Sequence, residues 1–311
     1  MERKKFSYKK DLFPVFLMGC LFVLIHGLAL LVTGPFEAAG MQAFEDPGDP
    51  MNLVVFFVII IAMTVAILLI AKYWKKQLIQ FIILGAVGYT SFYVFLPLLA
   101  LVFPGWWPLI LSIAFAVILT ITLFKYPEWY VIDVCGIIVG AGAIAIFGIS
   151  LDIFLVLILL IVLAIYDAIS VYKTKHMIDL ADTVMDLKLP VLLVIPKIRK
   201  YSLLKETKSL KEKLKDDEER DAFFMGLGDI VMPGILVVSA YHYAISNNLA
   251  GFPIAAGVII GTLAGFIVLM AFVIKGKPQA GLPCLCGGAI LGYLLSSYVW
   301  FGEIVGLNFS F

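Results

Sequence analysis

The sequence predicts an all-α membrane protein in which nine transmembrane helices form one bundle. Of its 311 residues, 62% are apolar and only 14% are charged, and the mean hydropathy is +1.05. Soluble domains have about 45–50% apolar residues and about 25% charged residues. A water-facing surface needs more charge than this chain carries, which excludes soluble enzymes, nucleic-acid binders and disordered scaffolds. We therefore expect an integral, multi-pass membrane protein, located in the cell membrane if its source is prokaryotic.

Nine stretches are long and apolar enough to cross a bilayer as helices. A spanning helix needs about 20 mostly apolar residues, and a helix satisfies its own backbone hydrogen bonds in lipid. The predicted spans are residues 12–33, 52–71, 79–103, 107–124, 130–149, 153–172, 222–245, 251–273 and 280–301. The joints at 104–105 and 150–152 are so short that the flanking spans must reverse direction as helical hairpins. The first span lacks a small-residue cleavage site, so we interpret it as a retained helix and not as a signal peptide.

The basic residues indicate how the bundle is oriented. All 23 Lys and Arg residues lie before the first span or in the connectors after the second, fourth, sixth and eighth spans. Acidic residues such as Glu37, Asp49 and Glu303 lie in the connectors on the other side. Because Lys and Arg collect in cytoplasmic segments, the N-terminus is predicted to be cytoplasmic and the C-terminus to be outside. A missing or added span would place basic residues on both sides, so the charge pattern also supports the span count.

The spans and connectors divide the chain into three regions. Residues 1–172 hold transmembrane helices 1–6, residues 173–220 form a cytoplasmic loop, and residues 221–311 hold helices 7–9. Within the loop, residues 205–219 mix both charge signs densely, which predicts a solvated linker or, as the alternative, a short exposed helix. Residues 189–196 are apolar, too short to span and bracketed by prolines, which predicts a short strand or a re-entrant segment.

Two aspartates lie inside predicted spans, where ionisable residues are rare. An Asp at the centre of a span costs about 2.5–3.5 kcal/mol on insertion scales, so it is a functional candidate. Asp167 and Asp229 both lie roughly 9–10 Å inside the cytoplasmic face, at about 1.5 Å of helical rise per residue. Two carboxylates that meet there share a proton, so one acts as a base on water and the other as an acid on a peptide carbonyl. Asp133 lies at the start of its span, where an interfacial carboxylate is ordinary.

The backbone beside these aspartates is predicted to be irregular. Gly226 and Gly228 precede the second aspartate, and Pro233 lacks the N–H that would bond to the carbonyl of that aspartate. Pro283 opens the ninth span at the same depth, and the carbonyls that it leaves unpaired are expected to hold an unwound substrate strand. Residues 191–195 are the strand expected on the other edge of that substrate.

Together these residues resemble the presenilin-type GxGD intramembrane aspartyl proteases. The resemblance extends over nearly the whole chain and rests on Tyr-Asp in the sixth span, Gly-Leu-Gly-Asp in the seventh and Ala-Gly-Leu-Pro at the start of the ninth. It implies that Asp167 and Asp229 are the catalytic pair. The residues that it implies as site-shaping or substrate-binding are Tyr166, Gly226, Leu227, Gly228, Ala280, Gly281, Leu282 and Pro283. Presenilins usually have Pro-Ala-Leu-Pro in the third motif, so Ala280 and Gly281 are departures that bear on substrate preference.

Two related families fit less well. Signal peptide peptidases share Tyr-Asp and Gly-x-Gly-Asp but have the opposite orientation in the membrane. Prepilin peptidases usually carry cytoplasmic cysteine pairs, whereas the four cysteines of this chain lie in predicted spans. The loop is shorter than the acidic loop of animal presenilins, and no feature implies an accessory subunit. The chain therefore resembles a stand-alone microbial or archaeal presenilin homologue.

The predicted function is that of an intramembrane aspartic endopeptidase. It would hydrolyse peptide bonds within transmembrane segments of single-pass membrane proteins, using the two aspartates and water. The predicted partners are these transmembrane-helix peptides and the lipid bilayer. No nucleic acid, obligatory accessory subunit, cofactor or metal is expected, and the sequence does not decide whether the chain forms a homo-oligomer. His26 and His242 are expected to be held by neighbouring residues. The alternative is a proton-coupled carrier with the two carboxylates as a proton relay, although the sequence lacks the repeated halves common in transporters.

Overall fold

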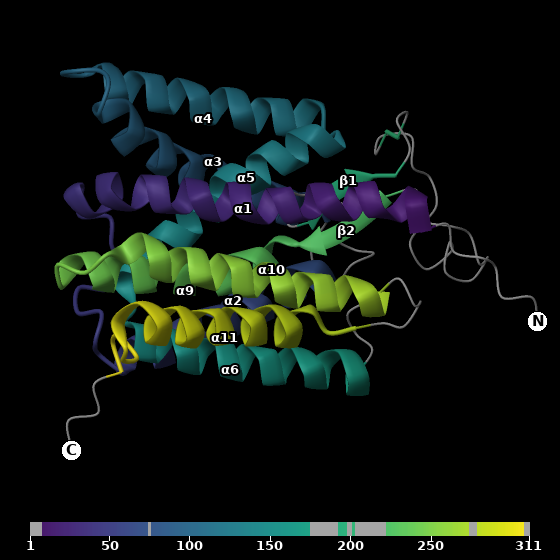
Figure 1. The fold of residues 1–311 in the computed structure, drawn as a ribbon. Helices are drawn as coiled ribbons and strands as arrows, with labels where there is room; N and C mark the ends of the chain where they lie inside the picture. The colour runs from purple at the N-terminus through teal and green to yellow at the C-terminus, as the bar shows by residue number, and fades with distance from the viewer. Residues whose placement is uncertain are drawn as a thin grey trace, which may run out of the picture.

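The computed structural model describes residues 8–73, 76–174, 192–197, 201–202, 222–273 and 279–307. Within these ranges the chain forms nine α-helices and one two-stranded antiparallel sheet (Figure 1). The helices are α1 (Tyr8–Ala38), α2 (Met51–Tyr73), α3 (Lys76–Ala100), α4 (Trp107–Lys125), α5 (Trp129–Ser150), α6 (Ile153–Ile169), α9 (Leu227–Ser246), α10 (Gly251–Val273) and α11 (Gly281–Phe301). A π-helical turn, η1 (Ser170–Thr174), continues α6, and the strands are β1 (Leu192–Pro196) and β2 (Ala222–Gly226).

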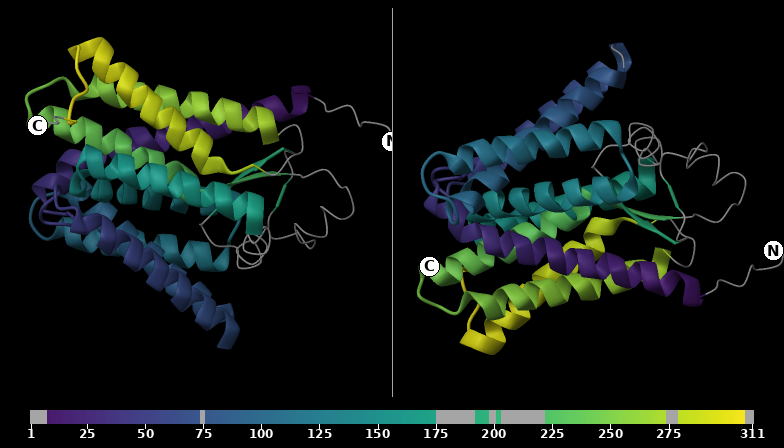
Figure 2. Two further views of the ribbon diagram at one scale, coloured as in Figure 1. Left: turned by 90° about the horizontal axis from the view of Figure 1, so that it is seen from below. Right: turned by 90° about the horizontal axis from the view of Figure 1, so that it is seen from above.

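Helix α9 is the centre of the bundle. It packs against α1, α5, α6, α10 and α11. In the most apolar stretches of α5 and α9, 61% of the residues are buried, against 22–39% in the corresponding stretches of the other six long apolar helices. Helix α2, by contrast, leans away from the bundle (Figure 2). Most of the fold therefore contributes to the position of α9 and of the aspartate that it carries.

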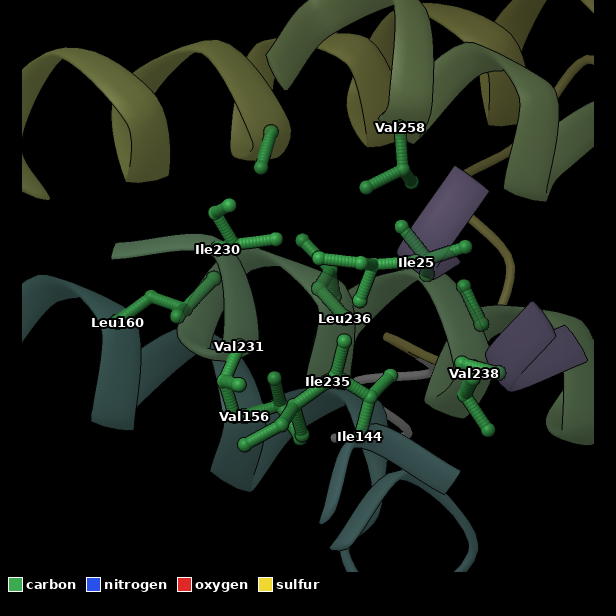
Figure 3. Close-up of a cluster of buried hydrophobic side chains, with 14 of the residues drawn as sticks. Ile25, Ile144, Val156, Leu160, Ile230, Val231, Ile235, Leu236, Val238 and Val258 are labelled. Atoms are coloured by element: carbon green, nitrogen blue, oxygen red, sulfur yellow. The ribbon is translucent and has the colours of Figure 1, made fainter. Parts of the chain in front are cut away.

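The main hydrophobic core surrounds α9 (Figure 3). Ile235 of α9 lies in this core with Ile25 of α1, Ile144 of α5, Leu160 of α6 and Val258 of α10. Each of these five side chains is fully buried. Apolar side chains gain no hydrophobic energy by leaving lipid for a protein core, so close van der Waals packing holds these helices together.

The predicted all-α bundle of nine helices is confirmed. Eight helices are long and apolar enough to cross a membrane, and α2 contributes a shorter apolar run, Met51–Ala66. Most helices begin and end within a few residues of the predicted spans. Helix α1 begins at the end of the bundle that holds the sheet, and α11 ends at the opposite end (Figure 1). Which of these ends faces the cytoplasm stays a prediction.

The sheet is the main departure from the predicted elements. The span predicted at 222–245 is helical only from Leu227, because its first five residues form β2. Strand β2 pairs with β1 in a register that places Phe224 opposite Val194. The sequence Ala-Phe-Phe-Met of β2 is as apolar as the helix after it, so hydropathy alone does not separate the two elements.

The predicted loop contains the other strand. Leu192–Pro196 forms β1, which confirms a strand within the predicted segment 189–196. The first three residues of that segment lie outside the described residues. The same is true of the linker predicted at 205–219.

Only one of the two short joints produces a packed hairpin. Helices α3 and α4 pack against each other across Pro104-Gly105, where Gly105 has a φ of +71° that suits glycine. Helices α5 and α6, both described in full, are not packed along each other; each packs against α9 instead. The chain therefore reverses direction at 150–152 as predicted, but α5 and α6 diverge to accommodate α9.

Helices α10 and α11 approach each other closely through glycines. A Cβ added to Gly261 would overlap the carbonyl oxygen of Gly288, and a Cβ added to Gly265 would overlap that of Cys284. Small residues let the backbones of two membrane helices come into direct contact. Since α11 begins with the third sequence motif, this contact holds that motif in place.

We expect Gly261→Ala to destabilise the protein by about 1–3 kcal/mol, because the added methyl group must push two backbones apart. The measurement is the thermal unfolding midpoint in detergent. Gly287→Ala is the matched control, since a Cβ at Gly287 of α11 would meet nothing within 4 Å. Equal midpoints for the two variants would show that the α10–α11 contact does not need glycine.

Candidate active site

Asp167 is held at the junction between α6 and α11. It lies in the last turn of α6 and is only 3% exposed. Its Oδ2 accepts a hydrogen bond from the backbone N–H of Leu282 at 3.0 Å, and the backbone of Gly281 also hydrogen-bonds to this carboxylate. The π-helical turn η1 begins at Ser170, three residues after Asp167, and such turns are frequent at functional sites.

Asp229 lies at the start of α9, directly after the strand-to-helix junction. It is the third residue of the helix, which begins at Leu227 with Gly226 as the N-cap. Its half-buried carboxylate bends back toward the helix start, since a Cβ added to Gly226 would lie 3.5 Å from its Oδ2. The unpaired N–H groups and the positive end of the helix dipole favour a carboxylate at this position.

The N-terminus of α11 lies between the two aspartates. Its first residue, Gly281, has no side chain, and a Cβ added there would lie 3.0 Å from Oδ2 of Asp229. Its second residue, Leu282, donates its N–H to Asp167. The two carboxylates are close enough to interact electrostatically. The site therefore joins the C-terminus of α6 to the N-termini of α9 and α11.

The remaining motif residues have different surroundings. Ala280 is buried at the N-cap of α11. Leu227 points toward α5, where a Cβ added to Gly140 would lie 3.1 Å from its Cδ1. Gly228 has open space around it, since a Cβ there would meet nothing within 4 Å, and Tyr166 is 69% exposed. Their predicted roles at the site stay predictions.

The start of α11 offers different free groups from those expected. The helix begins at Gly281, so Pro283 lies within its first turn. The first four N–H groups of a helix have no helical partner, and a proline there leaves no carbonyl unpaired. The free groups at this point are amide donors, and the carboxylate of Asp167 accepts hydrogen bonds from those of Leu282 and Gly281.

A buried aspartate contacts the sheet, which the sequence analysis did not anticipate. Asp133, the fifth residue of α5, is 7% exposed, and its Oδ1 accepts a hydrogen bond from the backbone N–H of Val194 at 2.8 Å. Gly136 and Gly140 follow at intervals of three and four residues, so they share one face of α5 with Asp133. This spacing of a carboxylate and two glycines is the sequence signal that marks α5 as a docking face.

Of the two histidines in spans, His26 is held by a neighbouring residue, as expected, whereas His242 has only a close approach to a carboxylate. His26 of α1 is fully buried, and its Nε2 donates a hydrogen bond to the carbonyl oxygen of Ile230 at 3.0 Å. Ile230 directly follows Asp229, so α1 supports the first turn of α9. Nε2 of His242 lies 3.2 Å from Oε1 of Glu37.

The chemistry available at the site is that of two neighbouring carboxyl groups. Such a pair can accept a proton at one oxygen and donate a proton from another. Among the described residues, no three His, Cys, Asp or Glu side chains come together as metal ligands. The four cysteines, all of them in described helices, form no disulfide.

Comparisons with known proteins agree with this geometry. Residues 19–302 match the family described as signal-peptide peptidase, presenilin aspartyl protease. The chain is 35% identical to a presenilin family intramembrane aspartate protease solved in a C222 crystal form, with a TM-score of 0.70 over 92% of this chain and 99% of that chain. The P2 crystal form gives 35% identity and a TM-score of 0.69 over 93% and 99%. No curated protein sequence matched. The chain therefore belongs to the signal-peptide peptidase and presenilin family of intramembrane aspartyl proteases.

Proposed function

We propose that this protease hydrolyses peptide bonds within transmembrane segments of single-pass proteins, with Asp167 and Asp229 as its acid–base pair. The observation that carries the proposal is the meeting of both carboxylates at the N-terminus of α11. Neighbouring carboxylates in a poorly hydrated site do not both ionise readily, so the pair shares a proton. The ionised carboxylate takes a proton from the attacking water, and the protonated one donates to the oxygen of the scissile carbonyl.

The amides of α11 orient one member of this pair. The Leu282 N–H holds Oδ2 of Asp167, and the backbone of Gly281 also hydrogen-bonds to this carboxylate, so the start of α11 fixes its orientation. A fixed carboxylate has less orientational freedom to lose in the reacting complex, which favours the rate of the chemical step.

The sheet offers an edge for an unwound substrate. Peptide bonds in a helix are shielded by their own hydrogen bonds, so the substrate must become extended near the aspartates. Val194 donates its N–H to Asp133 and not to β2, so the pair Val194–Phe224 is of the non-hydrogen-bonded kind. The N–H and C=O of Phe224 therefore face the outer edge of β2. We place the substrate strand along this edge, and not along β1 as the sequence suggested.

The orientation proposed from the sequence places the site near the cytoplasmic face. The sheet and the N-termini of α9 and α11 lie at the end of the bundle where α1 begins (Figure 1). Two described basic residues, Lys125 at the end of α4 and Lys197 after β1, lie in connectors that the sequence analysis assigned to the cytoplasmic side. Basic residues collect in cytoplasmic connectors, which supports this orientation.

Replacing either aspartate by asparagine is expected to abolish cleavage. Asp167→Asn and Asp229→Asn keep the side-chain size but remove acid–base function, which contributes about 10²- to 10⁴-fold to rates. The measurement is cleavage of a single-pass substrate by the detergent-purified protein, with products identified by mass spectrometry. Thermal unfolding midpoints close to wild type serve as the control. Cleavage by either variant would contradict the pairing, and proton transport without any cleavage by the wild type would favour a carrier.

The pH dependence of kcat is expected to be bell-shaped. Activity requires one protonated and one ionised carboxyl group, so it falls in acid, where both are protonated, and in base, where both are ionised. The two limbs belong to the pair and not to either residue. Cleavage rates measured from acid to alkaline pH test this, and a flat profile would count against a shared proton.

The backbone amide of Leu282 is expected to matter more than its side chain. Leu282→Ala keeps the N–H that Asp167 accepts, whereas Leu282→Pro removes it at a position of the first helical turn where proline is tolerated. We expect the Pro variant to be about 10-fold slower than the Ala variant, since hydrogen bonds to charged groups are the stronger kind. The comparison uses one fixed substrate, and equal rates would mean that this amide does not orient the carboxylate.

A further inference from the structure

Asp133 is a buried carboxyl group that the proposed chemistry does not use. It is 7% exposed, and its Oδ1 accepts the backbone N–H of Val194 at 2.8 Å. Burying a carboxyl group in an apolar helix is unfavourable, so its retention requires a compensating contact. The contact is with the central residue of β1.

This hydrogen bond closes one edge of the sheet. The N–H of Val194 points away from β2, so it would be an unpaired donor without Asp133. Hydrogen-bonded and non-hydrogen-bonded pairs alternate along antiparallel strands, so Pro196 is also in the outward-facing class. Proline has no N–H to offer there. At Val194 and Pro196 the outer edge of β1 therefore has no free N–H to offer another strand, whereas β2 keeps its outer edge.

Glycines of α5 bring the sheet and the start of α9 onto the same helix face. A Cβ added to Gly136 would lie 2.8 Å from Cδ2 of Leu193, and one added to Gly140 would lie 3.1 Å from Cδ1 of Leu227. Leu193 belongs to β1, and Leu227 begins α9 two residues before Asp229. Asp133 therefore holds the strand at the point where α5 also receives the catalytic helix.

We propose that Asp133 is a positioning residue that anchors the β1–β2 sheet to α5 and thereby determines which substrate bond faces the two catalytic aspartates. The inference rests on the proposed function, because it concerns the placement of a substrate strand on β2. Its role requires a hydrogen-bond acceptor and not a charge or a proton. Both the ionised and the protonated carboxyl group present an acceptor oxygen to Val194.

Two substitutions separate an acceptor from a charge. Asp133→Asn keeps an acceptor oxygen, whereas Asp133→Leu has a similar size and offers none. Ser239→Ala is the control for lost stability, because Ser239 of α9 donates a buried hydrogen bond to the carbonyl of Leu151, away from the sheet. All variants are purified in detergent as full chains and given the same single-pass substrate.

Three quantities are measured for each variant. They are kcat and KM, the ratio of products cut at neighbouring peptide bonds, and hydrogen exchange of the peptide that contains β1. The exchange measurement does not depend on catalysis. It reports directly whether the Val194 amide has lost its partner.

Asp133→Asn is expected to match the wild type in all three measurements. Asp133→Leu is expected to exchange β1 amides faster, to lower kcat by about 10-fold or more, and to spread cleavage over neighbouring bonds, because small displacements of reacting groups cost large factors in rate. Ser239→Ala is expected to keep the wild-type product ratio even where its unfolding midpoint falls.

A second single variant, on the donor side, covers the case in which Asp133→Leu does not fold. Val194→Pro removes the donor instead of the acceptor, at an outward-facing position where proline is tolerated. The spread of products is expected in Val194→Pro alone. Where Asp133→Leu folds, combining it with Val194→Pro should increase the spread no further.

Several results would overturn the proposal. Wild-type products and kcat in both Asp133→Leu and Val194→Pro would show that the anchor does not position the substrate. Loss of activity in Asp133→Asn with unchanged β1 exchange would assign Asp133 a charge or proton role instead. Failure of the proposed function would look different, because the wild type would then cleave nothing while the exchange measurement still reported the anchor.

Discussion

The placement of two carboxyl groups inside an apolar bundle is the constraint on which the rest of the structure depends. An Asp within a span is tolerated where the free backbone N–H groups at the start of another helix can hydrogen-bond to its carboxylate. An unbroken helix has no free N–H groups to offer. The fold meets this requirement by ending α6 and starting α9 and α11 at the same level, so that helix termini surround Asp167 and Asp229. The central position of α9, the divergence of α5 and α6, and the glycine contact between α10 and α11 all serve this convergence.

The absence of a side chain at Gly281 has a direct role in this convergence. The N-terminus of α11 passes so near Asp229 that a Cβ would come within 3.0 Å of its carboxylate oxygen. The presenilin motif that this segment resembles usually has alanine there, so the glycine leaves more space around the carboxylate in this chain. That space adjoins the two aspartates, so the residue at position 281 limits what fits beside them in this chain.

Much of this arrangement could be predicted from the sequence, and the exceptions have physical causes. Asp167 and Asp229 stand out because ionisable residues inside apolar runs are rare. Strand β2 does not stand out, because its residues are as apolar as α9. The depth estimated for Asp229 assumed a helix from Ala222, whereas the chain is extended until Gly226. The role of Asp133 was not predictable because its partner, Val194, is 61 residues away in a segment that hydropathy assigns to a loop.

The hydrogen bond between Asp167 and Leu282 joins residues that are 115 positions apart, and this distance has a consequence for biosynthesis. Chains fold from the N-terminus as they are made, so α6 is synthesised long before α11. A nascent chain that ends after α10 contains both aspartates but lacks the amides that hold one of them and the glycine that lies beside the other. The site that we propose to be catalytic is therefore complete only after α11 has been made.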